Sequence, residues 1–344
     1  MRKGPNTVRN QKLNLQPCSH RVIIPLYIPN EEDYYQDAFK IFKMCLVSVQ
    51  KTAVSPLKIS VISNGCIASV NNELLKLSQE GEIDELIIET EAIGKINSIL
   101  KALRTAEERL ITITDADVLF LNNWEREVLN VFEAIPNAGM VSPVPMYRTQ
   151  TRYTSNIWLR YLFSKKLRFS PVKNPEALIK FAKSVGWPGL KPHLTDVTVT
   201  LEGKNNILSV VGNAHFVGTY KNEIFKSMPK QNSVYKLGGN SERLYTDQPV
   251  LKHGGYRLAT YDNFAYHMGN TIEPWMISIF ENLNIEKKSY KDFENFKILK
   301  KNSLNYFLAE KCFKKLFYFE FFKRKIYQFK GLTKKQVELF IGGF

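Results

Sequence analysis

Two aspartates one residue apart, Asp115 and Asp117, follow an apolar stretch at 110–113 that is rich in β-branched residues. Such a stretch is typical of a buried strand, and side chains two apart on an extended chain point to the same side. Neighbouring carboxylates repel one another unless a cation lies between them. Mg²⁺ or Mn²⁺ prefers oxygen ligands of this kind, completed by water and phosphate. The triplet therefore predicts a divalent-metal site.

A simpler interpretation of the triplet is a solvated loop, or the N-cap of the helix expected at 124–132. However, open α/β sheets bind ligands at the carboxyl ends of their strands, and Asp115 and Asp117 lie at such an end. This position favours a functional role, and the rest of the chain has to decide between the two interpretations.

Three further residues could take part in chemistry. Asp247 lies where a helix is expected to begin, so it is either an N-cap or a catalytic base. His267 is either a ligand or a hydrogen-bonded histidine at the edge of the core, which is the commoner role of a lone histidine. Lys95 follows Gly94 at the start of a helix, where it either meets a phosphate as a point charge or remains solvated.

The elements that would position these residues alternate between strands and helices. Strands are expected at 21–27, 57–63, 86–88 and 110–114, with helices at 38–49, 70–77 and 94–108 between them. This order is typical of a parallel, doubly wound α/β sheet with right-handed connections. Pro25 should lie at the end of the first strand, because proline cannot donate to a central ladder.

The second half of the chain is less regular. Strands are expected at 139–144, 197–201, 207–211, 216–220 and 256–259, and helices at 124–133 and 175–185. Between 145 and 206, aromatic, basic and proline residues are mixed without a clear period. Long irregular segments inside a domain often serve as lids or binding walls, so we expect this one to contact a substrate.

The distribution of charge restricts the possible partners. The net charge of +15 over 344 residues is concentrated at the ends: residues 1–21 carry +5 and residues 286–344 carry +9. Because the middle is nearly neutral and holds no recognised nucleic-acid motif, we expect no nucleic-acid partner. The four cysteines have no paired spacing, and the sequence contains neither an apolar leader nor an uncharged apolar run of about 18 residues. These features predict a cytoplasmic protein.

The tail at 286–344 interleaves phenylalanine and tyrosine with lysine, and a helix is expected at 311–330. Such a helix either lies on an anionic membrane surface or packs its aromatic side chains on the rest of the protein. With the first interpretation, the protein would be peripheral on the cytoplasmic face of a membrane. Both interpretations can hold in part.

Several short motifs, in order along the chain, resemble those of glycosyltransferases with the GT-A fold, and in particular the inverting family 2 enzymes. They are Pro25-Leu26-Tyr27, Gly94-Lys95-Ile96-Asn97, Thr114-Asp115-Ala116-Asp117, Thr246-Asp247 followed by Gly255-Tyr256-Arg257, and His267. The likeness covers roughly residues 21–270, and the joint order is more specific than any single motif.

The resemblance implies a GT-A (Rossmann-like), mostly parallel, doubly wound sheet with a C-terminal helical extension. It divides the chain into a basic arm at 1–20, a catalytic domain at 21–285 and a basic aromatic helical extension at 286–344. Within the catalytic domain, residues 21–144 would bind the nucleotide sugar and residues 145–285 the acceptor.

The same resemblance implies transfer of a sugar from a nucleotide diphosphate sugar to a hydroxyl of a saccharide or lipid-linked saccharide, with inversion at the sugar carbon. The implied site residues are, for the donor, Pro25, Tyr27, Asn64, Lys95 and Asp115; for a Mn²⁺ or Mg²⁺ ion, Asp115, Asp117 and His267; and, as catalytic base, Asp247.

Two positions depart from the family pattern. Ser63-Asn64 stands where the family usually ends its second strand with an Asp pair, and Thr246 replaces a glutamate. A catalytically inactive sugar-binding or scaffold protein is therefore an alternative. A sugar-phosphate nucleotidyltransferase is a weaker one, because the segment at 25–29 is not the glycine-rich, arginine-bearing loop that such an enzyme needs.

Overall fold

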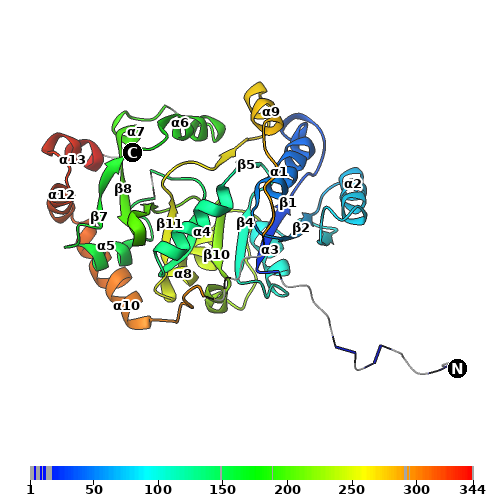
Figure 1. The fold of residues 1–344 in the computed structure, drawn as a ribbon, viewed down its shortest axis with the longest axis horizontal. Coiled ribbons are helices and arrows are strands. Elements are labelled where there is room, and N and C mark those ends of the chain that lie inside the picture. The colour runs from blue at the N-terminus through cyan, green and yellow to red at the C-terminus, as the bar shows by residue number, and fades with distance from the viewer. Residues whose placement is uncertain are drawn as a thin grey trace.

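One ten-stranded sheet forms the centre of the described structure, with helices on both sides (Figure 1). This computed structural model describes residues 4, 8–9, 11–12, 18–147, 149–187, 189–289, 293 and 295–342. Twelve of the twenty residues of the basic arm predicted at 1–20 lie outside the described ones, and His20 already belongs to β1. In chain order, the strands of the sheet are β1 (His20–Leu26), β2 (Leu57–Asn64), β3 (Glu85–Glu89), β4 (Leu110–Thr114), β6 (Ala138–Ser142), β7 (Leu167–Pro171), β8 (Val197–Glu202), β9 (Leu208–Val211), β10 (Val217–Lys221) and β11 (Tyr256–Thr260).

The spatial order of the strands is β3-β2-β1-β4-β10-β6-β11-β9-β8-β7. Strands β1 to β4 pair in parallel, and β10 runs antiparallel to both β4 and β6. Following the pairings across the sheet, seven of its ten described strands run in one direction and three, β7, β9 and β10, run in the other. The predicted mostly parallel α/β sheet is therefore confirmed.

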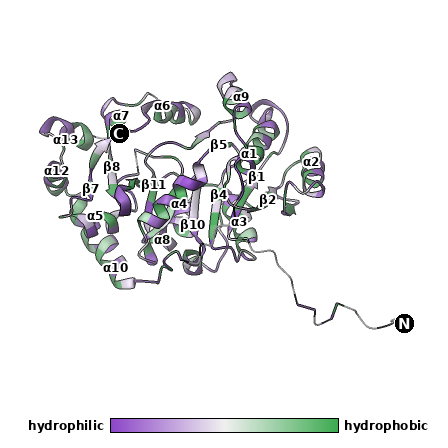
Figure 2. Cartoon of the chain, in the orientation of Figure 1, coloured by the Kyte–Doolittle hydropathy of each residue, from purple (hydrophilic) through white to green (hydrophobic). Residues whose placement is uncertain are grey.

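Helices cover both faces of the sheet, which makes it doubly wound. Along β1, Val22 and Ile24 belong to the apolar cluster that includes α1 and α4, whereas Ile23 belongs to a second cluster with α3. This alternation follows from the pleat of a strand buried on both sides, and Figure 2 shows strands β1 and β4 as largely hydrophobic. The helices are α1 (Ala38–Thr52), α2 (Ala68–Gln79), α3 (Lys95–Leu103), α4 (Trp124–Ala134), α5 (Ser155–Tyr161), α6 (Pro175–Ser184), α7 (His193–Asp196), α8 (Gln248–Lys252), α9 (Pro274–Glu281), α10 (Ser303–Phe307), α11 (Lys314–Tyr318), α12 (Glu320–Phe329) and α13 (Lys334–Ile341).

Two local features lie near the carboxyl ends of β1 and β4. Pro25 lies near the end of β1, as predicted. It is in register with Ile62 of β2 but lies beyond Ile23, the last residue of β1 that pairs with β4, so its missing N–H group removes no hydrogen bond between β1 and β4. A separate two-stranded antiparallel ribbon, formed by β5 (Val118–Phe120) and β12 (Ala265–His267), follows directly after β4. The sequence did not predict β5, because a three-residue strand has no measurable period.

The segment at 145–206, expected to be irregular, contributes α5 and β7, and strands β7, β8 and β9 extend the sheet as an antiparallel meander. The single helix predicted at 311–330 is wrong. The chain is extended at Phe319 (φ −66°, ψ 121°), which separates α11 from α12. The break allows Phe317 of α11 and Tyr327 of α12 to pack on the same buried ring, Trp158. No helix in the described part of the chain is long and apolar enough to cross a membrane.

A buried polar contact fixes the start of β1 to α4. The Nδ1 atom of His20 lies 2.7 Å from Glu125 Oε1, and Glu125 Oε2 accepts hydrogen bonds from the backbone N–H groups of Val54 and Ser55. Both side chains are inaccessible to solvent. Although burial raises the pKa of Glu125, the hydrogen bond and charge of His20 and the backbone donors more than offset this, so the pKa lies below its ordinary value.

We predict that Glu125→Gln lowers the free energy of unfolding by about 1–3 kcal/mol near neutral pH, because it removes the buried negative charge from three donors. Because the pKa of Glu125 is lowered in the folded state, its charge stabilises the fold at pH values above the ordinary pKa of 4.5. This stabilisation is lost as the pH falls through the lowered pKa. Chemical denaturation at a series of pH values should show the difference from wild type shrinking toward acid. The exposed Glu133→Gln, on the same helix, is the control. A pH-independent difference would contradict the assignment.

Candidate active site

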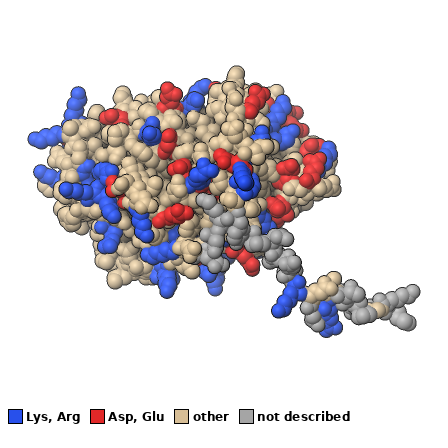
Figure 3. Space-filling model, in the orientation of Figure 1, with Lys and Arg blue, Asp and Glu red and all other residues tan. Residues whose placement is uncertain are grey.

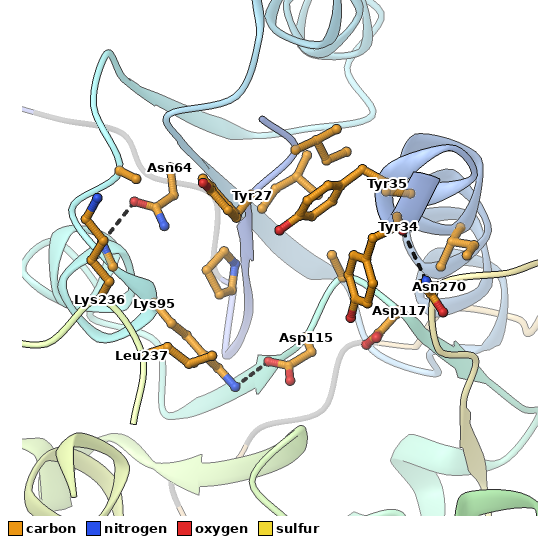
Figure 4. A pocket seen from close by; sticks show the side chains of 18 of the residues that line it. Tyr27, Tyr34, Tyr35, Asn64, Lys95, Asp115, Asp117, Lys236, Leu237 and Asn270 are labelled. Carbon is orange, nitrogen blue, oxygen red and sulfur yellow. Dashed lines mark hydrogen bonds and ion pairs between the residues drawn. The ribbon is translucent and has the colours of Figure 1, made fainter. Parts of the chain in front are cut away.

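A pocket of about 400 Å³ lies where β1, β2 and β4 end (Figure 4). Parallel strands present their carboxyl ends to one edge, so residues far apart in sequence meet there. Six residues predicted from sequence line this pocket: Pro25, Tyr27, Asn64, Lys95, Asp115 and Asp117. Of the other two, His267 contacts Asp117, and Asp247 lies deeper, outside the lining.

Lys95 is the central cation of the site. Its Nζ atom lies 2.6 Å from Asp115 Oδ1 and 3.2 Å from Glu242 Oε1, and the side chain is 17% exposed. Although burial lowers the pKa of Lys95, the carboxylates of Asp115 and Glu242 reverse this effect and raise the pKa above its ordinary value. Lys95 therefore stays charged, and it binds Asp115 directly rather than remaining solvated.

Asp117 and His267 face one another at the end of the β5–β12 ribbon. His267 pairs in register with Val118, which places its Nε2 atom 3.3 Å from Asp117 Oδ2. Burial raises the pKa of Asp117 to about 6, against the opposing effect of His267. Within the described residues, the buried atoms Asp117 Oδ1 and His267 Nδ1 have no hydrogen-bond partner.

A carboxylate oxygen and an imidazole nitrogen are both ligands for Mn²⁺, so a bound cation would give these two residues the partner that they lack. The predicted trio is not assembled, however: among the described residues, no three His, Cys, Asp or Glu side chains are arranged to hold a metal ion. Asp115 is engaged by Lys95 instead. The pair Asp117 and His267 fits a divalent ion that takes its remaining ligands from a bound substrate.

Three tyrosines also line the pocket. Tyr35 packs edge-on against both Tyr27 and Tyr34, with ring centroids 5.9 and 5.0 Å apart. Tyr27 and Tyr34 remain 45% and 64% exposed, so their rings present apolar surface to the opening. Sequence reasoning missed Tyr34 and Tyr35, although three tyrosines within nine residues after a strand are a usable signal for a stacking surface.

Asn64 shapes the wall beside α3. Its Oδ1 atom accepts hydrogen bonds from the backbone N–H groups of Ile93 and Gly94, at 2.7 and 3.0 Å. Gly94 has φ +93°, and a Cβ atom there would lie 2.7 Å from the backbone of Lys236. The Lys95 N–H donates to the Lys236 carbonyl oxygen at 3.0 Å. Asn64 therefore fixes the loop at 93–94. The segment at 236–237 packs on this loop and forms part of the pocket wall.

Asp247 has an environment that the sequence did not predict. A π-helical turn (Arg243–Asp247) precedes α8, so Asp247 lies inside a helical segment and caps nothing. Its carboxylate is inaccessible to solvent; Oδ1 lies 2.9 Å from Arg257 Nη2, and His215 Nε2 lies 2.8 and 2.9 Å from the two oxygens. Although burial raises the pKa of Asp247, Arg257 and His215 lower it below its ordinary value. A substrate hydroxyl can reach this carboxylate only if His215 moves.

A line of charged groups connects Asp247 to the pocket. The Nδ1 atom of His215 lies 3.7 Å from Glu242 Oε2, and Glu242 in turn binds Lys95. His215 and Glu242 are 22% and 33% exposed, unlike Asp247. Neither was predicted, because neither stands in a recognisable motif: His215 lies in an irregular segment and Glu242 in a short helical turn. They are the accessible titratable groups beside the buried aspartate.

No family model matches this chain, and neither does any curated protein sequence. Solved structures do match. They include mannosyltransferase PcManGT from Pyrobaculum calidifontis in complex with GDP-Man and Mn²⁺ (17% identity over 74% of this chain and 59% of that one, TM-score 0.38). Another is GalNAc-T7 with UDP, GalNAc and Mn²⁺ (12% identity over 72% of this chain and 43% of that one, TM-score 0.45). A third is S. aureus TarS 1–349 (11% identity over 73% of this chain and 60% of that one, TM-score 0.43).

Of these three proteins, PcManGT is a mannosyltransferase by name. This chain spans between 43% and 60% of the length of the three solved chains. At such identities and TM-scores, a match says nothing about donor, acceptor or stereochemistry, so the function is argued from the site.

We predict that Lys95→Met lowers the free energy of unfolding by about 1–3 kcal/mol, because Asp115 and Glu242 lose the cation between them. Lys101→Met is the matched control on the same helix, since Lys101 forms a more exposed ion pair with Glu89; its effect should stay below about 1 kcal/mol. Urea denaturation of both variants measures the difference. Equal effects would mean that Lys95 is an ordinary surface lysine.

Proposed function

We propose that this protein is a metal-dependent glycosyltransferase that moves a sugar from a nucleotide diphosphate sugar to a hydroxyl acceptor. The observation that carries the proposal is that one pocket combines aromatic and charged groups. Tyr27 and Tyr34 present exposed rings to the pocket, and Lys95, Asp115 and Asp117 supply its charged side chains, with Asp117 next to Tyr34 in Figure 4. A planar base attached to a charged diphosphate needs the same combination, and the volume of about 400 Å³ is in the range of small-molecule sites.

In this proposal, Asp117 and His267 hold a Mn²⁺ or Mg²⁺ ion. When bound, the ion neutralises the negative charge that develops on the diphosphate as the glycosidic bond breaks. Lys95 supplies a second positive charge from the protein, held in place by Asp115 and Glu242. Asp115 binds Lys95 through Oδ1, and its other oxygen would accept a hydrogen bond from the ribose.

The base of the donor would stack on Tyr27 and Tyr34 beside Asn64. The family places a carboxylate where this chain has Asn64, and the amide oxygen here already accepts two backbone hydrogen bonds. Recognition of the base would therefore depend on stacking and on backbone groups of the loop at 92–94. Stacking alone is tolerant of base identity, so we propose weak discrimination between nucleotides.

The acceptor hydroxyl must lose a proton as it attacks the sugar carbon opposite the leaving group, which inverts the configuration. Asp247 was the predicted base for this in-line attack. In its buried position it would act through His215: Asp247 accepts a hydrogen bond from the Nε2–H group, and Nδ1 is left to take the proton. Asp247 is then a positioning residue, and His215 is the group that touches the acceptor.

The proposal predicts that UDP or GDP raises the melting temperature only when Mn²⁺ is present, and that Asp117→Asn removes this metal-dependent shift. Asp117 would lose the charged oxygen that binds the ion, while the ribbon remains intact. Thermal shift with a panel of nucleotides, sugars and metals measures the effect, with Asp196→Asn, an exposed residue of α7, as control. A nucleotide shift that is unchanged in Asp117→Asn would exclude this metal site. Absence of any nucleotide shift, with intact folding, would favour the scaffold alternative.

A second prediction separates the two roles in acceptor activation. His215→Gln and Asp247→Asn should each keep the nucleotide and Mn²⁺ thermal shift but lower the rate of sugar transfer by about 10²–10⁴-fold. His215→Gln preserves a donor to Asp247 yet cannot take up a proton, so it should show the larger loss of rate. Asp247→Asn keeps the imidazole and should lose less. Near-wild-type transfer by His215→Gln would show that Asp247 receives the proton directly.

A further inference from the structure

The helix α12 carries aromatic side chains on its outer side as well as on its inner side, and Tyr327 is its buried residue. Its inner residue Tyr327 packs among Trp158, Phe169 and Phe340. Its outer side carries Phe321 and Phe329, which are 66% and 63% exposed. The predicted packing of the tail on the domain therefore accounts for only part of its aromatic side chains.

The exposed aromatic residues of α11 and α12 continue onto a second, distant segment of the chain. Phe163, in the loop after α5, is 86% exposed and lies against Phe329, with ring centroids 6.2 Å apart. We call the whole set the aromatic surface; it consists of Phe163, Leu316, Tyr318, Phe319, Phe321, Phe322 and Phe329. Exposed apolar groups of this number in one region mark a site of interaction rather than ordinary scatter.

The charges around the aromatic surface identify the partner. The acidic residues of 303–344 are Glu310, Glu320 and Glu338, and each is paired inside the tail: Glu310 with Lys314, and the other two with Arg324. Among the described residues, no carboxylate is paired with the exposed lysines that remain. These are Lys165, Lys166, Lys311, Lys315, Lys325, Lys334 and Lys335.

The lysines are interleaved with the rings. On the outer side of α12, Lys325 lies between Phe321 and Phe329 at helical spacing, with its Nζ atom 5.9 Å from the centre of the Phe321 ring. Figure 3 shows Lys and Arg gathered at the end of the molecule formed by α10 to α13, whereas the end near α2 carries acidic residues. On this face, basic side chains therefore outnumber acidic ones at the end that carries the aromatic surface.

Protein interfaces exclude lysine from their apolar centre, whereas lysine mixed with phenylalanine and tyrosine suits the boundary between lipid headgroups and acyl chains. We propose that the aromatic surface binds the surface of a membrane that contains anionic lipid. Its rings enter the headgroup region, and the unpaired lysines meet lipid phosphates. The donor pocket near α1 lies toward the other end of the molecule, so it remains open (Figure 1).

The test is flotation of the full chain with phosphatidylcholine vesicles, with and without phosphatidylglycerol, at two salt concentrations. We expect binding only to the anionic vesicles, weakened by salt. Phe321→Ser with Phe322→Ser should weaken binding tenfold or more. Lys315→Gln with Lys325→Gln should weaken it about tenfold while the rings stay in place. Leu75→Ser, an exposed apolar residue of α2, is the matched control.

Two results would overturn the proposal. One is no binding to anionic vesicles by a protein that is folded by circular dichroism. The other is a stable dimer in analytical ultracentrifugation that dissociates in Phe321→Ser with Phe322→Ser, which would assign the aromatic surface to a second copy of this chain. Neither readout uses a nucleotide sugar, so failure here leaves the proposed glycosyl transfer untouched.

Discussion

The arrangement of the site depends on the position of one ammonium group. Lys95 connects three segments that are far apart in sequence: the start of α3, the end of β4 at Asp115, and the helical segment that contains Glu242. Because the lysine binds both carboxylates, neither is left without a counter-charge. It also separates the roles of the two aspartates, since Asp115 is neutralised within the protein while Asp117 keeps an oxygen that no described group binds.

Much of the first half of the fold could be predicted, because its information is local. Each strand from β1 to β4 is a short apolar run and each intervening helix has a clear period, so the alternation alone determined the sheet. The pocket followed from the same logic. Lys95, Asp115 and Asn64 each stand at the end of a strand or the start of a helix, and a parallel sheet brings such ends together.

The remainder required information that is not local. Lys236 and His215 reach the site from irregular segments, and Glu242 reaches it from the short helical turn before Arg243; their positions follow from contacts with distant residues. The burial of Asp247 depends on Arg257, ten residues away on β11, and no spacing rule connects the two. The break at Phe319 is also a tertiary effect, because nothing in its neighbours stops a helix except the need to bring two rings onto Trp158.

The β5–β12 ribbon has a consequence for how such a chain can change over time. It joins segments separated by more than a hundred residues, yet it fixes His267 opposite Val118, next to Asp117. Because side chains alternate along a strand, an insertion of one residue within either strand would turn one of the pair to the opposite face. The intervening stretch contributes β6 to β11 to the central sheet, so most of it is fixed by other pairings. The connections between these strands are under no such restriction, and changes of their length can accumulate without disturbing the pair that the ribbon holds together.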